Sequence, residues 1–323
     1  MRLVARALAL RALTFATTSA GAVLAVGLCF ATLEGDAIDL LPNGPELRAQ
    51  LAAEWGLEGG VGQRLAGALS RAARFDFGTS LSVEPGTPVA TLMWSAGARS
   101  ARLLLPALVL ALLAGFGGAL LAGAAGERTP PPWRTRVVRL LSAASALPTV
   151  LAVLGVVSVG NHLTWQLVEG GHIDRPAWFA LPETDHPVRT LIAVVLLAGA
   201  SAAFAWSVAR ASHTLSDLAA RPFVAAERAR GGPVGWLFLR HMLVPAARMS
   251  AAQLPLLLSA LVVVERGIGM PGAGSLFWLS CGQRDWPLAV GLAVLAALVA
   301  TTARFMADTL AVLLDPRERD GLA

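Results

Sequence analysis

The chain has 323 residues and a formal net charge of +5; 55% of its residues are apolar and only 15% are charged. A soluble globular domain carries about 25% charged residues, so the composition excludes an ordinary soluble protein and indicates an integral membrane protein. The arginines lie at the ends of apolar segments, a placement that sets membrane topology and does not favour nucleic-acid binding.

Six apolar segments are long enough to cross a bilayer, which takes about 20 residues for a helix. They cover residues 12–33, 103–125, 137–159, 190–208, 243–264 and 288–314. Backbone polar groups must be satisfied inside the bilayer, so these segments are expected to be helices. The first has a basic start like that of a signal peptide, but its length and the lack of an A-x-A site directly after it favour a retained helix. The predicted fold class is an all-α integral membrane protein with six transmembrane helices.

Arginine is concentrated in the connections after the second and fourth segments and in the C-terminal tail, whereas acidic residues dominate the other loops. This asymmetry predicts that both termini are cytoplasmic. It also predicts a large first extracytoplasmic loop over residues 34–100 and a cytoplasmic segment between helices 4 and 5. We expect a single transmembrane domain over residues 1–323, with residues 1–102 forming the first helix and its loop and residues 103–323 forming the core.

The first outer loop has its own helical pattern. Apolar residues recur at helical spacing in residues 46–55 and 61–75, which predicts two short amphipathic helices packed on the membrane surface or on each other. The glycines and prolines of residues 75–92 predict an ordered, turn-rich loop. The second outer loop is expected over residues 160–189, where Trp165 and Trp178 are typical interfacial anchors.

The sequence lacks the motifs of several chemical activities. The sequence has no P-loop, and GIGMPG at residues 267–272 matches GxGxxG only after an apolar helix instead of a strand. The five histidines have no zinc-site spacing, and the two cysteines are expected to be unpaired packing residues. No catalytic residue, metal or cofactor is therefore expected. Charge is scarce within the apolar segments, with Arg304 the main exception, which argues against an ion-coupled carrier.

A charged element interrupts this apolar pattern between helices 4 and 5. Residues 223–241 read FVAAERARGGPVGWLFLRH. The pattern predicts a short helix that begins with Phe223 and Val224 and stops at Gly231. Pro233 then suits the first turn of a second helix. Such a helix can press into a groove on another protein; the alternative is a flexible polar linker.

This element resembles the cytoplasmic "EAA" loop of the permease subunits of ABC importers, and most closely the peptide/nickel (oligopeptide and dipeptide type B) family. In that family the loop reads Y-V-x-x-A-R-A-K-G and is followed by a helix with R-H-x-L-x-N-A. Matching positions here are Phe223, Val224, Arg228, Ala229, Arg230, Gly231, Arg240, His241, Leu243 and Ala246.

Other family elements occur in the same order along the chain. They are GDAIDL (35–40), DFGTSL (76–81) with Pro88-Val89, ALPT (146–149), VERGIGMPGAG (264–274), RDWPLAVG (284–291) and LLDPRER (313–319). The chain departs from the family pattern at Glu227, Pro245, Arg304 and Ile268, the last beside Gly267. These departures bear on the docking contacts and do not change the resemblance.

The resemblance implies a permease subunit of an ATP-driven importer in the bacterial cytoplasmic (inner) membrane. It implies a second, homologous permease subunit, two cytoplasmic ATPase subunits that hydrolyse the ATP, and an extracytoplasmic solute-binding protein. The residues implied in ATPase coupling are Phe223, Val224, Ala225, Ala226, Glu227, Arg228, Arg230, Gly231, Arg240 and His241. Those implied at the outer gate or binding-protein side are Asp76, Gly78, Glu265, Pro271, Gly272, Arg284 and Asp285.

Several alternatives stay open at the level of sequence. Glu265, Arg266, Arg284 and Asp285 form local ion pairs at an outer gate or are solvated charges, and Glu227 faces solvent or a cation on a partner. The substrate is a peptide, nickel or another small solute, and the two permeases are identical or different. Competing functions are a secondary transporter or channel, which works without ATP, and a membrane scaffold that does not transport.

Overall fold

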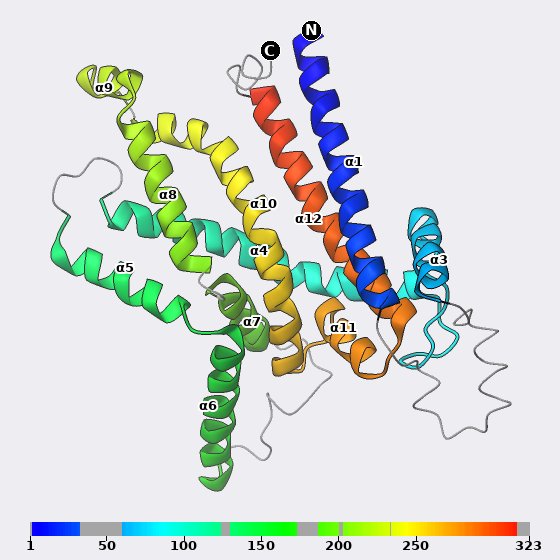
Figure 1. Cartoon of the computed structure of the whole chain (residues 1–323). Coiled ribbons are helices and arrows are strands. Elements are labelled where there is room, and N and C mark those ends of the chain that lie inside the picture. Colours follow the sequence, from blue (N-terminus) through cyan, green and yellow to red (C-terminus); the bar gives the residue numbers. More distant parts are fainter. Residues whose placement is uncertain are drawn as a thin grey trace, which may run out of the picture. The chain divides into compact units, whose positions relative to one another are not determined.

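The computed structural model describes residues 2–32, 60–123, 130–172, 187–199, 203–232 and 234–314. These residues form helices joined by turns (Figure 1), with one isolated antiparallel bridge between Thr79 and Pro88. The helices are α1 (Arg2–Ala31), α3 (Val61–Arg74), α4 (Val89–Leu121), α5 (Pro132–Ser145), α6 (Thr149–Glu169), α7 (Pro187–Gly199), α8 (Ala203–Ala219), α9 (Pro222–Ala229), α10 (Val234–Ile268), α11 (Ala273–Gly282) and α12 (Trp286–Leu314).

Five of these helices are long and apolar enough to cross a membrane, or up to six if α7 and α8 form one bent span. The prediction of an all-α membrane protein is confirmed. The predicted first, second, fifth and sixth apolar segments fall within α1, α4, α10 and α12, apart from residues at their ends. Helix α4 begins well before the predicted start at residue 103. Arginines before that residue lower the local hydropathy, so hydropathy did not mark these turns as part of the span.

The third apolar segment is not the continuous span that was predicted over residues 137–159. The chain turns at residues 146–148, which separates α5 from α6. Pro148 is the extended N-cap of α6, and proline lacks the N–H that a continuing helix needs. Helix α6 then extends to Glu169, so the first ten residues of the predicted second outer loop are helical.

The fourth apolar segment is also divided. Helices α7 and α8 lie on either side of residues 200–202 and are inclined to each other by 56°. Helix α8 continues to Ala219, beyond the predicted end at residue 208. Its last turns mix polar and apolar residues, so a prediction based on apolar segments ended before them. Several predicted features lie outside the described residues: the helix over 46–55, GDAIDL, Trp178, Pro233 and the tail from residue 315.

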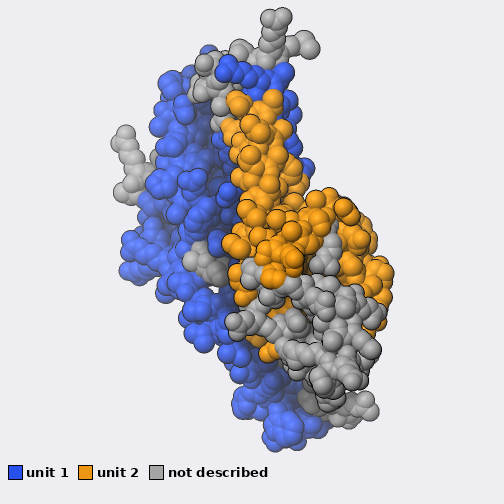
Figure 2. Space-filling model, turned by 45° about the vertical axis from the view of Figure 1, so that its right-hand side comes forward, with its two compact units in different colours: residues 1–8, 102–270, 303–323 blue, residues 9–101, 271–302 orange. Residues whose placement is uncertain are grey.

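Internal contacts divide the chain into two compact units, coloured separately in Figure 2. Unit 1 comprises residues 1–8, 102–270 and 303–323, and unit 2 comprises residues 9–101 and 271–302.

In unit 1, α10 packs against α6, α7 and α8, and a core of small and branched apolar side chains fills these contacts. Helices α4 and α8 approach each other closely. A Cβ atom added to Gly115 would lie 2.5 Å from the Cβ of Ser207, so only glycine fits there. The side chain of Ser207 also bonds to the amide of Gln253, which joins α8 to α10.

In unit 2, α1 and α12 run antiparallel. The Ser19 hydroxyl donates to Thr301 at 3.1 Å, and the rings of Phe30 and Trp286 lie 5.8 Å apart. The predicted helix over residues 61–75 is confirmed as α3. Of its periodic apolar residues, Leu65 lies against Gly27 of α1, while Ala72 is buried in a core shared with α4 and α12.

Candidate functional sites

The segment between the fourth and fifth predicted spans folds as a closed helical element. Arg221 is the extended N-cap of α9, and Pro222 occupies its first position, where a missing N–H costs nothing. At the other end, the N–H of Gly231 donates to the carbonyl of Arg228 at 3.1 Å, and the N–H of Gly232 donates to the carbonyl of Glu227 at 3.0 Å. These two bonds define a Schellman motif.

Gly231 is the residue that makes this closure possible. Its φ is +69°, in the left-handed region that side chains with a Cβ disfavour. The predicted glycine stop is therefore confirmed. The short helix is a defined structure with both ends satisfied, which excludes a flexible polar linker over residues 222–232.

The two apolar residues at the start of α9 face different surroundings. Phe223 is 39% exposed, and its ring stacks on the imidazole of His241 with 5.0 Å between centroids and 27° between planes. Val224 is fully buried within the chain, where α9 contacts α8 and α10. Val224 thus holds α9 to its own chain and presents no surface to a partner, which corrects the partner-facing role expected for it.

Glu227 is oriented toward its own chain. Its carboxylate lies 4.0 Å from the guanidinium of Arg230, and its side chain occupies the space next to Gly232. The side chain of Glu227 is 32% exposed and that of Arg230 is 78% exposed. Glu227, at the third position of the EAA triplet, thus packs over the glycine closure of its own chain. This orientation differs from both expected alternatives, solvent and a cation on a partner. Of the other predicted coupling residues, those with exposed side chains or surfaces are Ala225, Ala226, Arg228, Gly231, Arg240 and His241.

A second site forms in unit 2 around Asp285, which is fully buried directly before α12. Its Oδ2 accepts the Ser80 hydroxyl at 2.5 Å and the backbone N–H groups of Leu81, Ser82 and Val83 at 3.0, 3.1 and 3.2 Å. A run of backbone N–H groups that curve around one point is a general anion-binding arrangement. The buried carboxylate is stabilised because these donors replace the water it has lost.

The other carboxylate oxygen links the same residue to α12. Oδ1 of Asp285 accepts the N–H of Leu288 at 3.4 Å, the geometry of an N-cap. The Ser82 hydroxyl also donates to the carbonyl of Gln283 at 2.9 Å, at the C-terminal end of α11. These contacts, which we call the Asp285 anchor, join residues 80–83 to the end of α11 and the start of α12.

The loop that the anchor holds is ordered, as predicted. Asp76 is exposed and accepts the N–H of Gly78 at 3.1 Å, and the carbonyl of Gly78 accepts the N–H of Val89 at 2.9 Å. Two residues without glycine's freedom have left-handed backbones, namely Phe75 at φ 54° and Arg284 at φ 55°. Each precedes an aspartate of the site, and such strain persists only where surrounding contacts impose it.

The remaining predicted outer residues divide between the units. Pro271 is exposed, and Gly272 is the N-cap of α11, with its N–H donating to the Ser275 hydroxyl at 3.1 Å. The N–H of Ala273 donates to Ser100 of α4 at 2.7 Å, which fixes the start of α11. Glu265 is fully buried but belongs to α10 in unit 1.

Burial decides between ion pairs and solvated charges for two of the four predicted outer charges, Glu265 and Asp285. Neither Glu265 nor Asp285 is a solvated charge, because both are completely buried. Within the described part of the chain, the partners of Asp285 are the hydrogen-bond donors of the anchor and not an arginine.

Nearby on α11, burial raises the pKa of the Cys281 thiol, and a hydrogen bond with Ser280 opposes this rise in part.

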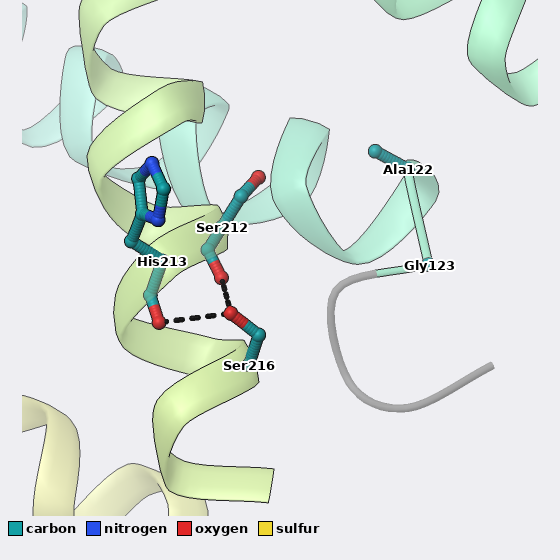
Figure 3. Close-up of a pocket in the computed structure, with 5 residues that line it drawn as sticks. All are labelled: Ala122, Gly123, Ser212, His213 and Ser216. Carbon is teal, nitrogen blue, oxygen red and sulfur yellow. Dashed lines mark hydrogen bonds between the residues drawn. The ribbon is translucent and has the colours of Figure 1, made fainter. Parts of the chain in front are cut away.

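A shallow hollow of about 270 Å³ lies between the end of α4 and the middle of α8 (Figure 3). It is lined by Ala122, Gly123, Ser212, His213 and Ser216. The Ser216 hydroxyl donates to the carbonyls of Ser212 at 2.8 Å and His213 at 3.0 Å, so it is engaged within its own helix. The hollow brings together none of the residues that the sequence implied.

Comparison with known proteins finds several transport permeases that are similar to this chain. The chain is 26% identical over 282 residues to the oligopeptide transport system permease protein OppB of Escherichia coli, covering 85% of this chain and 86% of the relative. It is also 26% identical to the glutathione transport system permease protein GsiC of E. coli, over 89% of this chain and 90% of the relative. The chain is thus similar over most of its length to permease proteins of oligopeptide and glutathione transport systems. No family model matches the sequence.

A third transport permease is similar to the same degree. The oligopeptide transport system permease protein AppB of Bacillus subtilis is 26% identical over 249 residues, which is 75% of each chain. This chain is a multi-pass membrane protein, as its composition indicated.

Sequence reasoning missed the residues that bind Asp285. RDWPLAVG and DFGTSL were both recognised as family elements, but nothing in either motif indicated that one binds the other. Three of the five donors are N–H groups of Leu81, Ser82 and Val83, and a backbone donor leaves no mark on the residue type. Ser80, two residues after the predicted Gly78, is the one described residue that binds Asp285 through its side chain, so its residue type could have indicated the contact.

Proposed function

We propose that this permease is the transmembrane subunit of an ATP-driven importer and forms half of a translocation path for peptides or similar small solutes. It pairs with a second permease, and ATP hydrolysis takes place on two separate cytoplasmic ATPase subunits. Both termini lie on the cytoplasmic side of the bacterial inner membrane. The names of OppB, AppB and GsiC, which concern oligopeptides and glutathione, support a peptide-like solute.

The observation that carries the coupling part of the proposal is the closed helix α9 between two membrane helices. Its outer side presents Phe223 and a set of small and basic residues, while its inner side is fixed by buried Val224. A short, rigid helix with an exposed aromatic anchor is suited to helix-in-groove binding.

The same geometry gives α9 the properties of a lever. It contacts both α8 and α10, and the stacking of Phe223 on His241 joins its first turn to the first turns of α10. A force applied to α9 by closing ATPase subunits would therefore be transmitted to α10, the helix that packs against α6, α7 and α8. Arg228 and Arg230 would contribute charge contacts to the ATPase or to anionic lipid.

In the extracytoplasmic part of the chain, the loop held by the Asp285 anchor is proposed to meet the solute-binding protein. The anchor fixes that loop before any partner arrives, which reduces the entropy lost on docking. Asp76, Gly78, Pro271 and Arg284 would contribute to this surface, while the buried residues Gly272 and Asp285 position it.

The decisive experiment replaces Phe223 and Gly231, singly, with Asp and measures co-purification with the ATPase and transport by the assembled complex. Both variants are expected to lose both activities, because Asp at 223 removes the aromatic anchor and Asp at 231 puts a charged side chain on the exposed closing turn, where φ is +69°. Phe223→Trp keeps an aromatic surface and serves as the matched control. Survival of co-purification and transport in both Asp variants would refute the coupling role.

A further inference from the structure

Among the charged residues within the candidate membrane spans, Arg248, Arg304 and Asp308 lie in unit 1 and belong to neither proposed surface. The guanidinium of Arg248 on α10 lies 3.7 Å from the carboxylate of Asp308 on α12, and their side chains are 40% and 32% exposed. Arg304 lies one turn before Asp308 on α12 and is also exposed. Arg304 departs from the family pattern, Arg248 belongs to none of the motifs described above, and the proposed coupling and docking surfaces use neither.

The ion pair also locates these charges along the spans. Arg248 follows the start of its candidate span at Arg240, and Asp308 precedes the end of its candidate span at Leu314. Arg304 lies ten residues before Leu314, about 15 Å along a helix that rises 1.5 Å per residue. The cluster thus lies within the half of the membrane from which α9 emerges.

The direction in which the charges face follows from helical geometry. Successive residues of an α-helix are rotated by about 100°, so Asp308 lies about 40° from Arg304, whereas Leu313 lies about 180° away. Leu313 and Met306 are exposed by 50% and 65%, as expected of a lipid-facing side, whereas Ala311, close to Asp308 on the wheel, is fully buried. The charges therefore share the side of α12 that faces the protein.

Charged residues within spans pair with one another and face the bundle interior or a water-filled cavity. The ion pair with Arg248 shows that Asp308 faces α10 and not open lipid. Arg248 and Arg304 bring two positive charges to this part of unit 1, and Asp308 brings one negative charge. Guanidinium groups bind carboxylates with particular strength because both partners are charged and their geometries match.

We propose that Arg248, Arg304 and Asp308 line the inner half of the translocation path and form a cationic site for the carboxylate of the passing solute. Asp308 holds Arg248 in place until a solute carboxylate competes for it. This inference rests on the proposed transport function and adds the substrate class, small solutes with a free carboxylate. A neutral or cationic solute would gain no attraction at this point.

The test uses cysteine accessibility in inside-out membrane vesicles that contain the full chain with its two native cysteines replaced by serine. Ala300→Cys places a thiol one turn before Arg304 on the same side, and Met306→Cys is the matched control on the lipid-facing side. A water-soluble anionic methanethiosulfonate and a cationic one are compared. We expect modification of Ala300→Cys to be about tenfold faster than that of Met306→Cys, and faster with the anionic reagent, because the local charge is positive.

Two further measurements address charge and ligand. Adding Arg304→Gln to the Ala300→Cys chain should abolish the preference for the anionic reagent. Tri-alanine should slow modification, and tri-alanine amide, which lacks the carboxylate, should not.

The inference is overturned if both cysteines react equally, if Arg304→Gln leaves the reagent preference unchanged, or if the acid and the amide protect alike. None of these readouts requires an ATPase. A failure of ATPase coupling would therefore be recognised separately, through co-purification.

Discussion

Replacement of Asp285 by Asn is expected to loosen the loop that this residue anchors. Asn keeps the shape but removes the charge, so the four donors around Oδ2 meet at best a neutral amide oxygen. A hydrogen bond to a charged group contributes about 1.5–3 kcal/mol and a neutral one about 0.5–1.5 kcal/mol. Because the four donors share one oxygen, the losses do not simply add, and we expect about 2–4 kcal/mol of local destabilisation.

Hydrogen exchange measures this loss directly at the amides of residues 81–83. A change of about 2–4 kcal/mol corresponds to roughly 30- to 1,000-fold faster exchange through local opening, at 1.36 kcal/mol per factor of ten. Mass spectrometry of a peptide spanning residues 76–92 resolves that range.

Asp76→Asn in the same loop is the matched control. Asp76 is exposed and accepts a single described hydrogen bond, from Gly78, so its replacement should change exchange by only about threefold or less. If Asp285→Asn left exchange within that same factor, the anchor would not be what orders the loop.

Three other predictions concern the helices. Gly231→Ala should weaken the closure of α9 by about 1 kcal/mol because φ is +69°, seen as faster exchange there, whereas Gly235→Ala within α10 should be neutral or stabilising. Gly115→Ala should lower thermal stability in detergent by about 1–3 kcal/mol through overpacking against α8, whereas Gly117→Ala, with no atom near the new Cβ, should not. Cys281 should react slowly with maleimide at neutral pH, and its rate should keep rising at a pH where that of a small free thiol has levelled off, because burial raises its pKa.

Sequence alone predicted the helical membrane class and the closed element of α9, because both depend on local signals. Hydropathy marks spans by composition, and a glycine after an amphipathic helix marks a left-handed stop. Breaks within spans were harder to predict. Pro148 was visible within a recognised motif, but an apolar run on both sides of it favoured a single span, and the structure divides it into α5 and α6.

The orientation of individual side chains could not be predicted. Val224 and Phe223 are adjacent and both apolar, so residue type does not distinguish the buried side chain from the exposed one. Their burial is decided by α8 and α10, whose contacts with α9 depend on tertiary packing. The contact of Asp285 with Ser80 joins residues 205 positions apart. The other donors to the same oxygen are backbone N–H groups, for which residue patterns carry no signal.

The backbone character of the Asp285 anchor has a consequence for how this surface can evolve and be engineered. The carboxylate contacts the N–H groups of residues 81–83, so these bonds do not depend on residue type, except that proline lacks the donor. The Ser82 hydroxyl is itself part of the anchor, and Val83 packs against the core of unit 2. Leu81 is therefore the position at which a library would vary this loop while the anchor is retained.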